Sequence, residues 1–185
     1  YQSCNIYFYQ LVRKLSLSDW KEFAEKFGFG SITGVDLYGE QAGNVPGKSY
    51  LNKKYGKYGW ATGNLLTFII GQGDLLVTPL QVVQMMNIIA TRGNTRSPHF
   101  YLDDSSENVT LSLKLSTWDY LQNATWKVVN HENGTGKAAR INGATVHGKT
   151  GTAQNPHGED HSWFAGYLVK DGHPVLSLVV LVEHG

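Results

Sequence analysis

Apolar side chains recur at helical spacing near the start of the chain. One such segment runs from Ile6 to Leu15, and a second runs from Asp19 to Phe27 with its apolar residues on one face. Ser18 precedes the second segment as a helix-capping residue, and Gly28 follows it as a helix-ending residue. The pattern therefore predicts two amphipathic helices in this part of the chain.

Glycine dominates the next stretch. From Gly28 to about Gly63, glycine recurs every few residues and Pro46 lies among them. Because both residue types interrupt regular structure, we predict a long, irregular but ordered loop region here.

The strongest helical pattern begins at Thr78-Pro79. Thr78 suits the N-cap, and Pro79 suits the first helical position because its missing N–H is not needed there. The body from Val82 to Ala90 is apolar nearly all round and is closed by Gly93. We therefore predict a mostly buried helix.

A further helix is predicted from Ser116 to Asn130, followed by a turn at Asn133-Gly134-Thr135-Gly136.

The last part of the chain has strand-like patterns. Three runs, separated by turn residues, are predicted as strands: Ala144 to Ala153, Trp163 to Val169 and Val175 to Val182. Asp171-Gly172 predicts a tight hairpin between the last two. Helices followed by an antiparallel meander indicate an α+β protein with a sheet covered by helices. We expect one domain over residues 1–185, with a helical part at 1–140 and the sheet at 141–185.

Composition narrows the function classes only a little. The chain has 16 basic and 15 acidic residues, a formal net charge of +1 and 41% hydrophobic residues, as in an ordinary globular protein. This balance gives no strong field toward nucleic acid, so we expect no nucleic-acid partner. Cys4 is the only cysteine, which excludes an intrachain disulfide.

One motif in the C-terminal part allows a second interpretation, a nucleotide-binding loop. Gly143 to Thr150 matches the phosphate-loop pattern G-x-x-x-x-G-K-[ST] in full. That loop needs a helix directly after it, because the helix N-terminus holds the phosphates. The residues that follow, Gly151 to Gly158, cannot propagate a helix, so a nucleotide-hydrolysing protein remains a remote alternative.

The same residues have another interpretation as a strand. Lys149-Thr150-Gly151 then presents a cation, a hydroxyl and a residue without a side chain, as in serine acyltransferases that use S-x-x-K, S-x-N and K-T-G. The cation and the hydroxyls can bind a carboxylate, and Gly151 lets a substrate backbone approach closely. Ser3-Cys4-Asn5 supplies an S-x-N motif at the other end of the chain.

Several blocks of sequence resemble a class B penicillin-binding protein, over nearly the whole chain. The aromatic run after S-x-N and the F-G-F-G with T-G-x-D-L block are most similar to the elongation-type transpeptidases, the penicillin-binding protein 2 group. The matching blocks are Ser3 to Gln10, Phe27 to Gly30, Thr33 to Leu37, Gly39-Glu40, Gly71 to Gly73, Thr78 to Gln81 and His147 to Gln154.

This resemblance implies a penicillin-binding, serine β-lactamase-like fold and a peptidoglycan D,D-transpeptidase. Such an enzyme cross-links peptide stems by serine acyl transfer from D-Ala-D-Ala, and β-lactams acylate the same serine. It also implies a periplasmic location at the bacterial inner membrane, and partners among the cell-wall elongation machinery, including a glycosyltransferase. We expect no cofactor.

The resemblance also assigns roles to individual residues. Ser3 is expected to relay a proton, Asn5 to hold the substrate amide, and Lys149 to polarise Ser3. The hydroxyls of Thr150 and Thr152 are expected to take the substrate carboxylate, and the backbone N–H of Thr152 is expected to serve the oxyanion.

The nucleophile is the point of departure from the family pattern. In the family its S-x-x-K segment lies before S-x-N. Ser16-Leu17-Ser18-Asp19 and Ser49-Tyr50-Leu51-Asn52 have Asp and Asn where lysine is required. Both chain ends look cut, so we expect a C-terminal fragment whose nucleophile lies outside it and which is inactive alone.

The family chemistry is common to several kinds of protein, and the residues do not decide among them. A D,D-carboxypeptidase, a class D-like β-lactamase and a membrane β-lactam sensor share it, whereas a non-enzymatic module that packs against a missing half belongs to another class. His157-Gly158-Glu159-Asp160-His161 has metal-ligating residue types, but Pro156 and Gly158 place it in a turn. We interpret it as a solvated loop and expect no metal ion.

Overall fold

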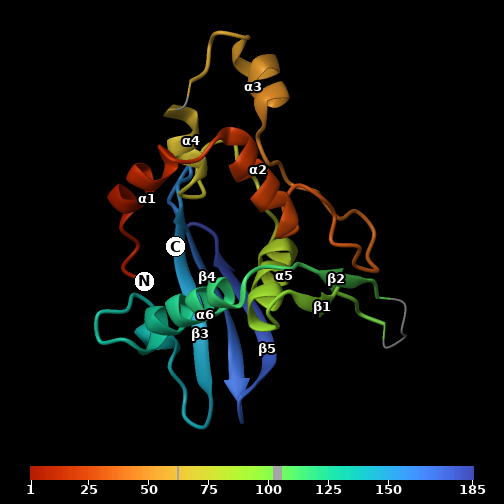
Figure 1. Ribbon diagram of the computed structural model, residues 1–185, viewed down its shortest axis with the longest axis vertical. Coiled ribbons are helices and arrows are strands. Elements are labelled where there is room, and N and C mark those ends of the chain that lie inside the picture. The colour runs from red at the N-terminus through yellow and green to blue at the C-terminus, as the bar shows by residue number, and fades with distance from the viewer. Residues whose placement is uncertain (62, 102–105) are drawn as a thin grey trace. The chain divides into compact units, whose positions relative to one another are not determined.

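The computed structural model describes residues 1–61, 63–101 and 106–185, and the chain divides into two compact units. The first unit comprises Tyr1–Ser3, Thr33–Glu40 and Pro79–Gly185. The second comprises Cys4–Ile32 and Gln41–Thr78. Figure 1 labels the helices and strands of both.

A three-stranded antiparallel sheet forms the base of the first unit (Figure 1). Its strands are β3 (Thr145–Ala153), β4 (His161–Lys170) and β5 (His173–Val182), in the order β3-β4-β5. The turn between β4 and β5 has positive φ angles at both Asp171 (51°) and Gly172 (79°). A tight turn of this kind matches the twist of the strands, and the predicted hairpin is confirmed.

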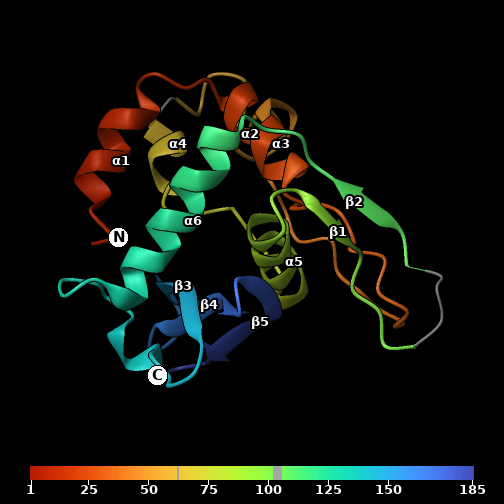
Figure 2. The same ribbon diagram turned by 60° about the horizontal axis from the view of Figure 1, so that its bottom comes forward.

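Two long helices of the first unit pack against this sheet (Figure 2). Helix α6 (Leu115–Asn130) contacts β3, and helix α5 (Pro79–Ala90) contacts β4 and β5. Val128 and Val129 of α6 form a buried cluster with Val146 of β3. Both predicted helices and the α+β class are confirmed, and Pro79 is the first residue of its helix as expected.

The end of α5 is fixed by a close approach at Gly93, which has φ of +85°. A Cβ atom there would lie 1.9 Å from the carbonyl oxygen of Leu111, so only glycine fits. Beyond Gly93 the chain forms a short ribbon of β1 (Asn94–Arg96) and β2 (Asn108–Thr110), and a 3-10 turn, η1 (Lys137–Ala139), follows α6. The pattern of the sequence did not predict these three short elements.

The second unit is helical. It contains α1 (Asn5–Val12), α2 (Leu17–Lys26), α3 (Lys48–Tyr55) and α4 (Gly63–Phe68). One buried cluster in it contains four apolar side chains, with partly buried aromatic and aliphatic residues packed around them: Val12, Leu51, Leu65 and Phe68.

Two predictions for this unit are wrong. The N-cap of α2 is Ser16, not Ser18, because Asp19 completes a capping box with Ser16. The region from Gly28 to Gly63 is not loop throughout, since α3 lies within it and buries Leu51 completely.

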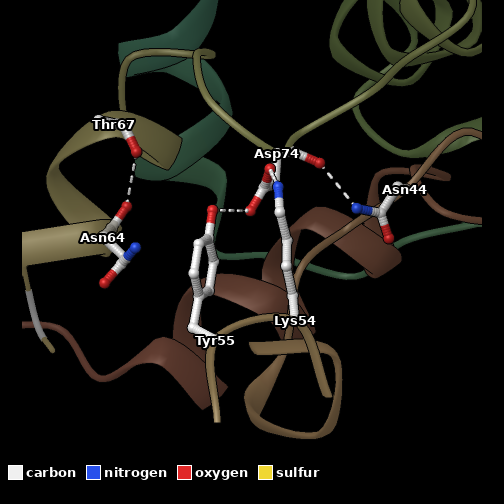
Figure 3. A network of polar contacts seen from close by, with 6 residues as sticks. All are labelled: Asn44, Lys54, Tyr55, Asn64, Thr67 and Asp74. Carbon is white, nitrogen blue, oxygen red and sulfur yellow. Dashed lines mark hydrogen bonds and ion pairs between the residues drawn. The ribbon is translucent and has the colours of Figure 1, made fainter. Parts of the chain in front are cut away.

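A polar network around Asp74 holds the segment from Gly71 to Asp74, which precedes α5, in place (Figure 3). The carboxylate of Asp74 pairs with the ammonium of Lys54 and accepts a hydrogen bond of 2.9 Å from the Tyr55 hydroxyl. Its backbone carbonyl accepts from the Asn44 side chain at 2.7 Å. The hydrogen bond with Asp74 raises the pKa of Lys54, so the cation persists over the whole physiological range.

Within the described part of the chain, no helix combines the length and the apolar character needed to cross a bilayer.

Candidate active site

The first unit brings Ser3 of the S-x-N motif and Lys149 of the K-T-G motif together. The Nζ atom of Lys149 donates a hydrogen bond of 2.7 Å to the Oγ atom of Ser3, across 146 residues of sequence. Ser3 adopts φ of +51°, a region that residues with a side chain rarely occupy. Because this strained backbone accompanies a side-chain contact with Lys149, it is typical of a functional position.

Lys149 is partly buried in the middle of β3. Besides Ser3, its ammonium contacts the carbonyl oxygen of Thr150 at 2.5 Å. No carboxylate forms an ion pair with it among the residues described by the structure. Burial therefore lowers the pKa of Lys149, and its amine can exchange a proton with a neighbouring hydroxyl more readily than a solvated lysine can.

The residues after Lys149 line an accessible stretch of the same strand. Thr150 is half-buried, and its Oγ1 atom lies 2.8 Å from the Oγ1 atom of Thr135. Gly151 and Thr152 are exposed. A Cβ atom on Gly151 would meet only the Cβ of Trp163, at 3.3 Å, so its bare backbone leaves space for an extended ligand beside the strand.

Close packing explains why residue 148 is a glycine. A Cβ atom at this position would lie 2.4 Å from Cζ of Phe164 and 3.0 Å from the carbonyl oxygen of Ala165. Glycine thus lets the Phe164 ring pack beneath the strand directly before Lys149.

Asn5 is the first residue of α1 and belongs to the second unit, whereas Ser3 belongs to the first. Its side chain is exposed. The expected role of Asn5 in holding a substrate amide stays a prediction.

Comparison with known proteins decides the family. The model of the penicillin binding protein transpeptidase domain matches residues 1–185. The chain belongs to this family.

Proteins named MrdA or PBP2 are among the relatives that this chain matches. The peptidoglycan D,D-transpeptidase MrdA of Haemophilus influenzae is 30% identical over 99% of this chain, which spans 32% of that relative. The penicillin-binding protein PBP2 of Helicobacter pylori, solved in complex with MreC, has a TM-score of 0.89 and 32% identity. The alignment covers 100% of this chain and 35% of that one. A third match is a chain of a peptidoglycan synthase complex, from a structure on the coordination of polymerization and crosslinking. Its TM-score is 0.79 and its identity is 30%. The alignment covers 97% of this chain and 32% of that chain.

The expectation that the S-x-x-K spacing is found only outside residues 1–185 is wrong. Ser18-Asp19-Trp20-Lys21 has the form S-x-x-K, so the motif spacing does occur in this sequence. It follows S-x-N instead of preceding it. The Ser18 hydroxyl lies 2.8 Å from that of Ser16, and the ammonium of Lys21 pairs with Glu25. Among the described residues, no hydrogen bond joins Ser18 to Lys21, whereas a nucleophile of the family needs its lysine beside it as a base.

The phosphate-loop interpretation is not supported by the transpeptidase fold. Gly148, Lys149 and Thr150 lie inside strand β3, which continues to Ala153. The next element is strand β4, so no helix N-terminus is available to hold phosphates.

The chain also has a cavity of about 480 Å³, and Lys149 is not among the residues that line it. His147 and Tyr167 line it together with the ends of α5 and β4. The Nδ1 atom of His147 lies 2.9 Å from the Tyr167 hydroxyl and 3.1 Å from the carbonyl oxygen of Gln122. Burial lowers the pKa of His147 and raises the pKa of Tyr167.

The histidine-rich turn, His157 to His161, joins β3 to β4. The His161 ring contacts that of His184, with 5.0 Å between the centroids. Within the described residues, no three His, Cys, Asp or Glu side chains are grouped as metal ligands. His157, Glu159 and Asp160 are exposed.

Proposed function

We propose that the full-length protein containing these residues is a peptidoglycan D,D-transpeptidase of the elongation type. The observation that carries the proposal is the hydrogen bond from Lys149 to Ser3, on a strand that continues with Thr150, Gly151 and Thr152. Family membership over the whole chain, and relatives named as D,D-transpeptidases, support it.

The proposed reaction is acyl transfer in two steps. A serine hydroxyl attacks the penultimate D-Ala carbonyl of a peptide stem, the C–N bond breaks, and D-Ala leaves after gaining a proton on its nitrogen. An amine of a second stem then attacks the acyl-enzyme, loses a proton, and releases the serine hydroxyl. We place this nucleophile in an S-x-x-K segment outside residues 1–185.

The residues of this chain have defined parts in that reaction. Ser3 relays the proton between the catalytic lysine of S-x-x-K and the leaving or attacking amine, and Lys149 holds the relay in position. Thr150 and Thr152 bind the terminal carboxylate, while Gly151 lets the stem backbone lie close to the strand. Asn5 binds the substrate amide.

The same proposal covers location and partners. One similar structure is a complex with MreC, and another is a peptidoglycan synthase complex. We infer that the full-length protein works with a glycosyltransferase and other elongation proteins at the periplasmic face of the inner membrane.

Covalent labelling with a fluorescent penicillin tests the proposal. The full-length protein should label, and mass spectrometry should place the adduct on a serine outside residues 1–185. An adduct on Ser18, or on Ser3, would contradict the assignment of the nucleophile. Cross-linked product from two peptide stems separates a transpeptidase from a carboxypeptidase or a β-lactamase, which release hydrolysed product only.

Substitution of Lys149 gives the matched comparison. Lys149→Ala should slow labelling by about 100-fold or more, because it removes the group that holds Ser3, the proton relay, in position. Lys170→Ala removes an exposed lysine at the end of β4 and should label like the wild type. Equal labelling of both variants would remove the basis of the proposal.

A further inference from the structure

A hydroxyl from outside the recognised motifs contacts the carboxylate-binding strand. The Oγ1 atoms of Thr135 and Thr150 lie 2.8 Å apart, a hydrogen-bond distance for two hydroxyls. Thr150 is in β3, whereas Thr135 is in the turn that follows α6.

Two buried glycines hold Thr135 in this place. Gly134 and Gly136 are both buried, while Thr135 between them is exposed. A Cβ atom on Gly134 would lie 2.3 Å from the carbonyl oxygen of Val128 and 2.5 Å from that of Lys127. The turn therefore lies against the end of α6 in a way that only glycine permits, and this contact sets the position of Thr135.

Hydrogen bonds fix the same turn from both sides. The N–H of Gly136 donates to the carbonyl oxygen of Val128 at 2.8 Å. Arg140 donates from Nε to Val129 at 2.8 Å and from Nη2 to His131 at 3.1 Å. These bonds also satisfy carbonyls at the helix end, so the exposed Thr135 has a well-supported backbone.

The number of protons on the two threonine hydroxyls decides which of them donates when a carboxylate is bound. Each hydroxyl carries one proton, and one of the two protons lies between the oxygens. Thr150 can donate to a bound carboxylate only if Thr135 donates to Thr150. With Thr135 as donor, Thr150 is left with its proton directed at the ligand, and its hydroxyl no longer rotates freely.

We propose that Thr135 is a positioning residue that orients the Thr150 hydroxyl toward the carboxylate of the substrate or of a β-lactam. This inference rests on the proposed function, because it assigns Thr135 to the carboxylate subsite of that same site. Thr135 acts through Thr150 and takes no part in bond making.

The experiment compares a penicillin that has its carboxylate with one that does not. Acylation rates of the full-length protein are measured with benzylpenicillin and with its methyl ester. Thr135→Val keeps the shape and removes the hydroxyl. It should lower the rate for benzylpenicillin on the order of tenfold, the effect expected for one hydrogen bond, and change the rate for the ester less than about twofold. Thr135→Ser keeps the hydroxyl and should restore the rate.

A double-variant cycle tests that Thr135 acts through Thr150. In a Thr150→Val background, Thr135→Val should have no further effect on acylation by benzylpenicillin. Thr145→Val, at the start of β3 and outside the site, controls for replacing a threonine of this strand.

The outcomes separate the two proposals. A wild-type protein that neither penicillin acylates would overturn the proposed function and this inference with it. A labelled wild type with equal losses for both penicillins, or with no loss in Thr135→Val, would overturn the role of Thr135 alone. If Thr135→Val does not fold, Thr135→Ala and Thr135→Ser give the same comparison.

Discussion

Single residues of the sheet show how burial adjusts acid–base behaviour. Lys149 has hydroxyl and carbonyl partners, and burial without an ion pair lowers its pKa. His147, two residues earlier on β3, is likewise half-buried, and its pKa also falls. Burial thus lowers the pKa at two positions of one strand, one beside Ser3 and one beside Tyr167.

The pKa of His147 gives a stability prediction with a definite sign. Its folded-state pKa lies below the ordinary value of 6.5, so the unfolded chain binds the proton more readily. The contribution of His147 to stability is therefore present above that value and is lost as the pH falls through the folded pKa. Thermal melting of the full-length protein between about pH 8 and about pH 5 should show a smaller loss in His147→Gln than in the wild type.

The surroundings of His147 and a control complete this test. Tyr167, Gln122 and Thr125 contact its Nδ1 atom, and Arg92 shares the cavity that it lines. His157→Gln removes an exposed histidine from the β3–β4 turn. An identical pH profile for His147→Gln and the wild type would contradict the assignment.

The secondary-structure elements differ in how plainly the sequence encodes them. Pro79 and Gly93 bracket α5, and the Asp171-Gly172 turn separates β4 from β5, so local chemistry predicts these elements. Helix α3 has only Leu51 buried among polar neighbours, and glycines at 47 and 56 flank it. The hydrophobic pattern of α3 is too weak to predict a helix. The helix is stabilised by the tertiary contacts of Leu51 and has no continuous apolar face.

The capping box of α2 can be tested at the level of the element. Ser16 accepts a hydrogen bond from the backbone N–H of Asp19 at 3.1 Å, while Ser18 makes no such bond. Ser16→Ala should cost about 1 kcal/mol of helix stability, and hydrogen exchange in the first turn of α2 should accelerate about fivefold. Ser18→Ala is the matched control, and faster exchange in Ser18→Ala but not in Ser16→Ala would return the cap to Ser18.

At the scale of the whole molecule, the candidate site could be predicted only in part. The sequence motifs pointed to Ser3 and Lys149, and in the fold the Nζ atom of Lys149 lies 2.7 Å from the Oγ atom of Ser3. No pattern pointed to Thr135, because its contact with Thr150 depends on how the turn after α6 packs. The S-x-x-K spacing at Ser18 shows that a motif can also mislead. The spacing matches the family pattern, but its lysine, Lys21, is paired with Glu25.

The fold also gives a prediction about nucleotides. Lys149 and Thr150 lie inside a strand, with a second strand as the next element. The full-length protein should therefore show no saturable magnesium-dependent ATP binding by isothermal titration calorimetry. Tight binding that Lys149→Ala abolishes would restore the phosphate-loop interpretation.

The contact between Ser3 and Lys149 joins residues 146 positions apart. Closing so long a loop is entropically unfavourable until the sheet and its helices are in place, so we expect this contact to form late in folding. A chain still emerging during synthesis has made Ser3 long before it makes Lys149. Under the proposed function, reaction with a penicillin would then report completed folding, and pulse labelling could time the maturation of the protein in the cell.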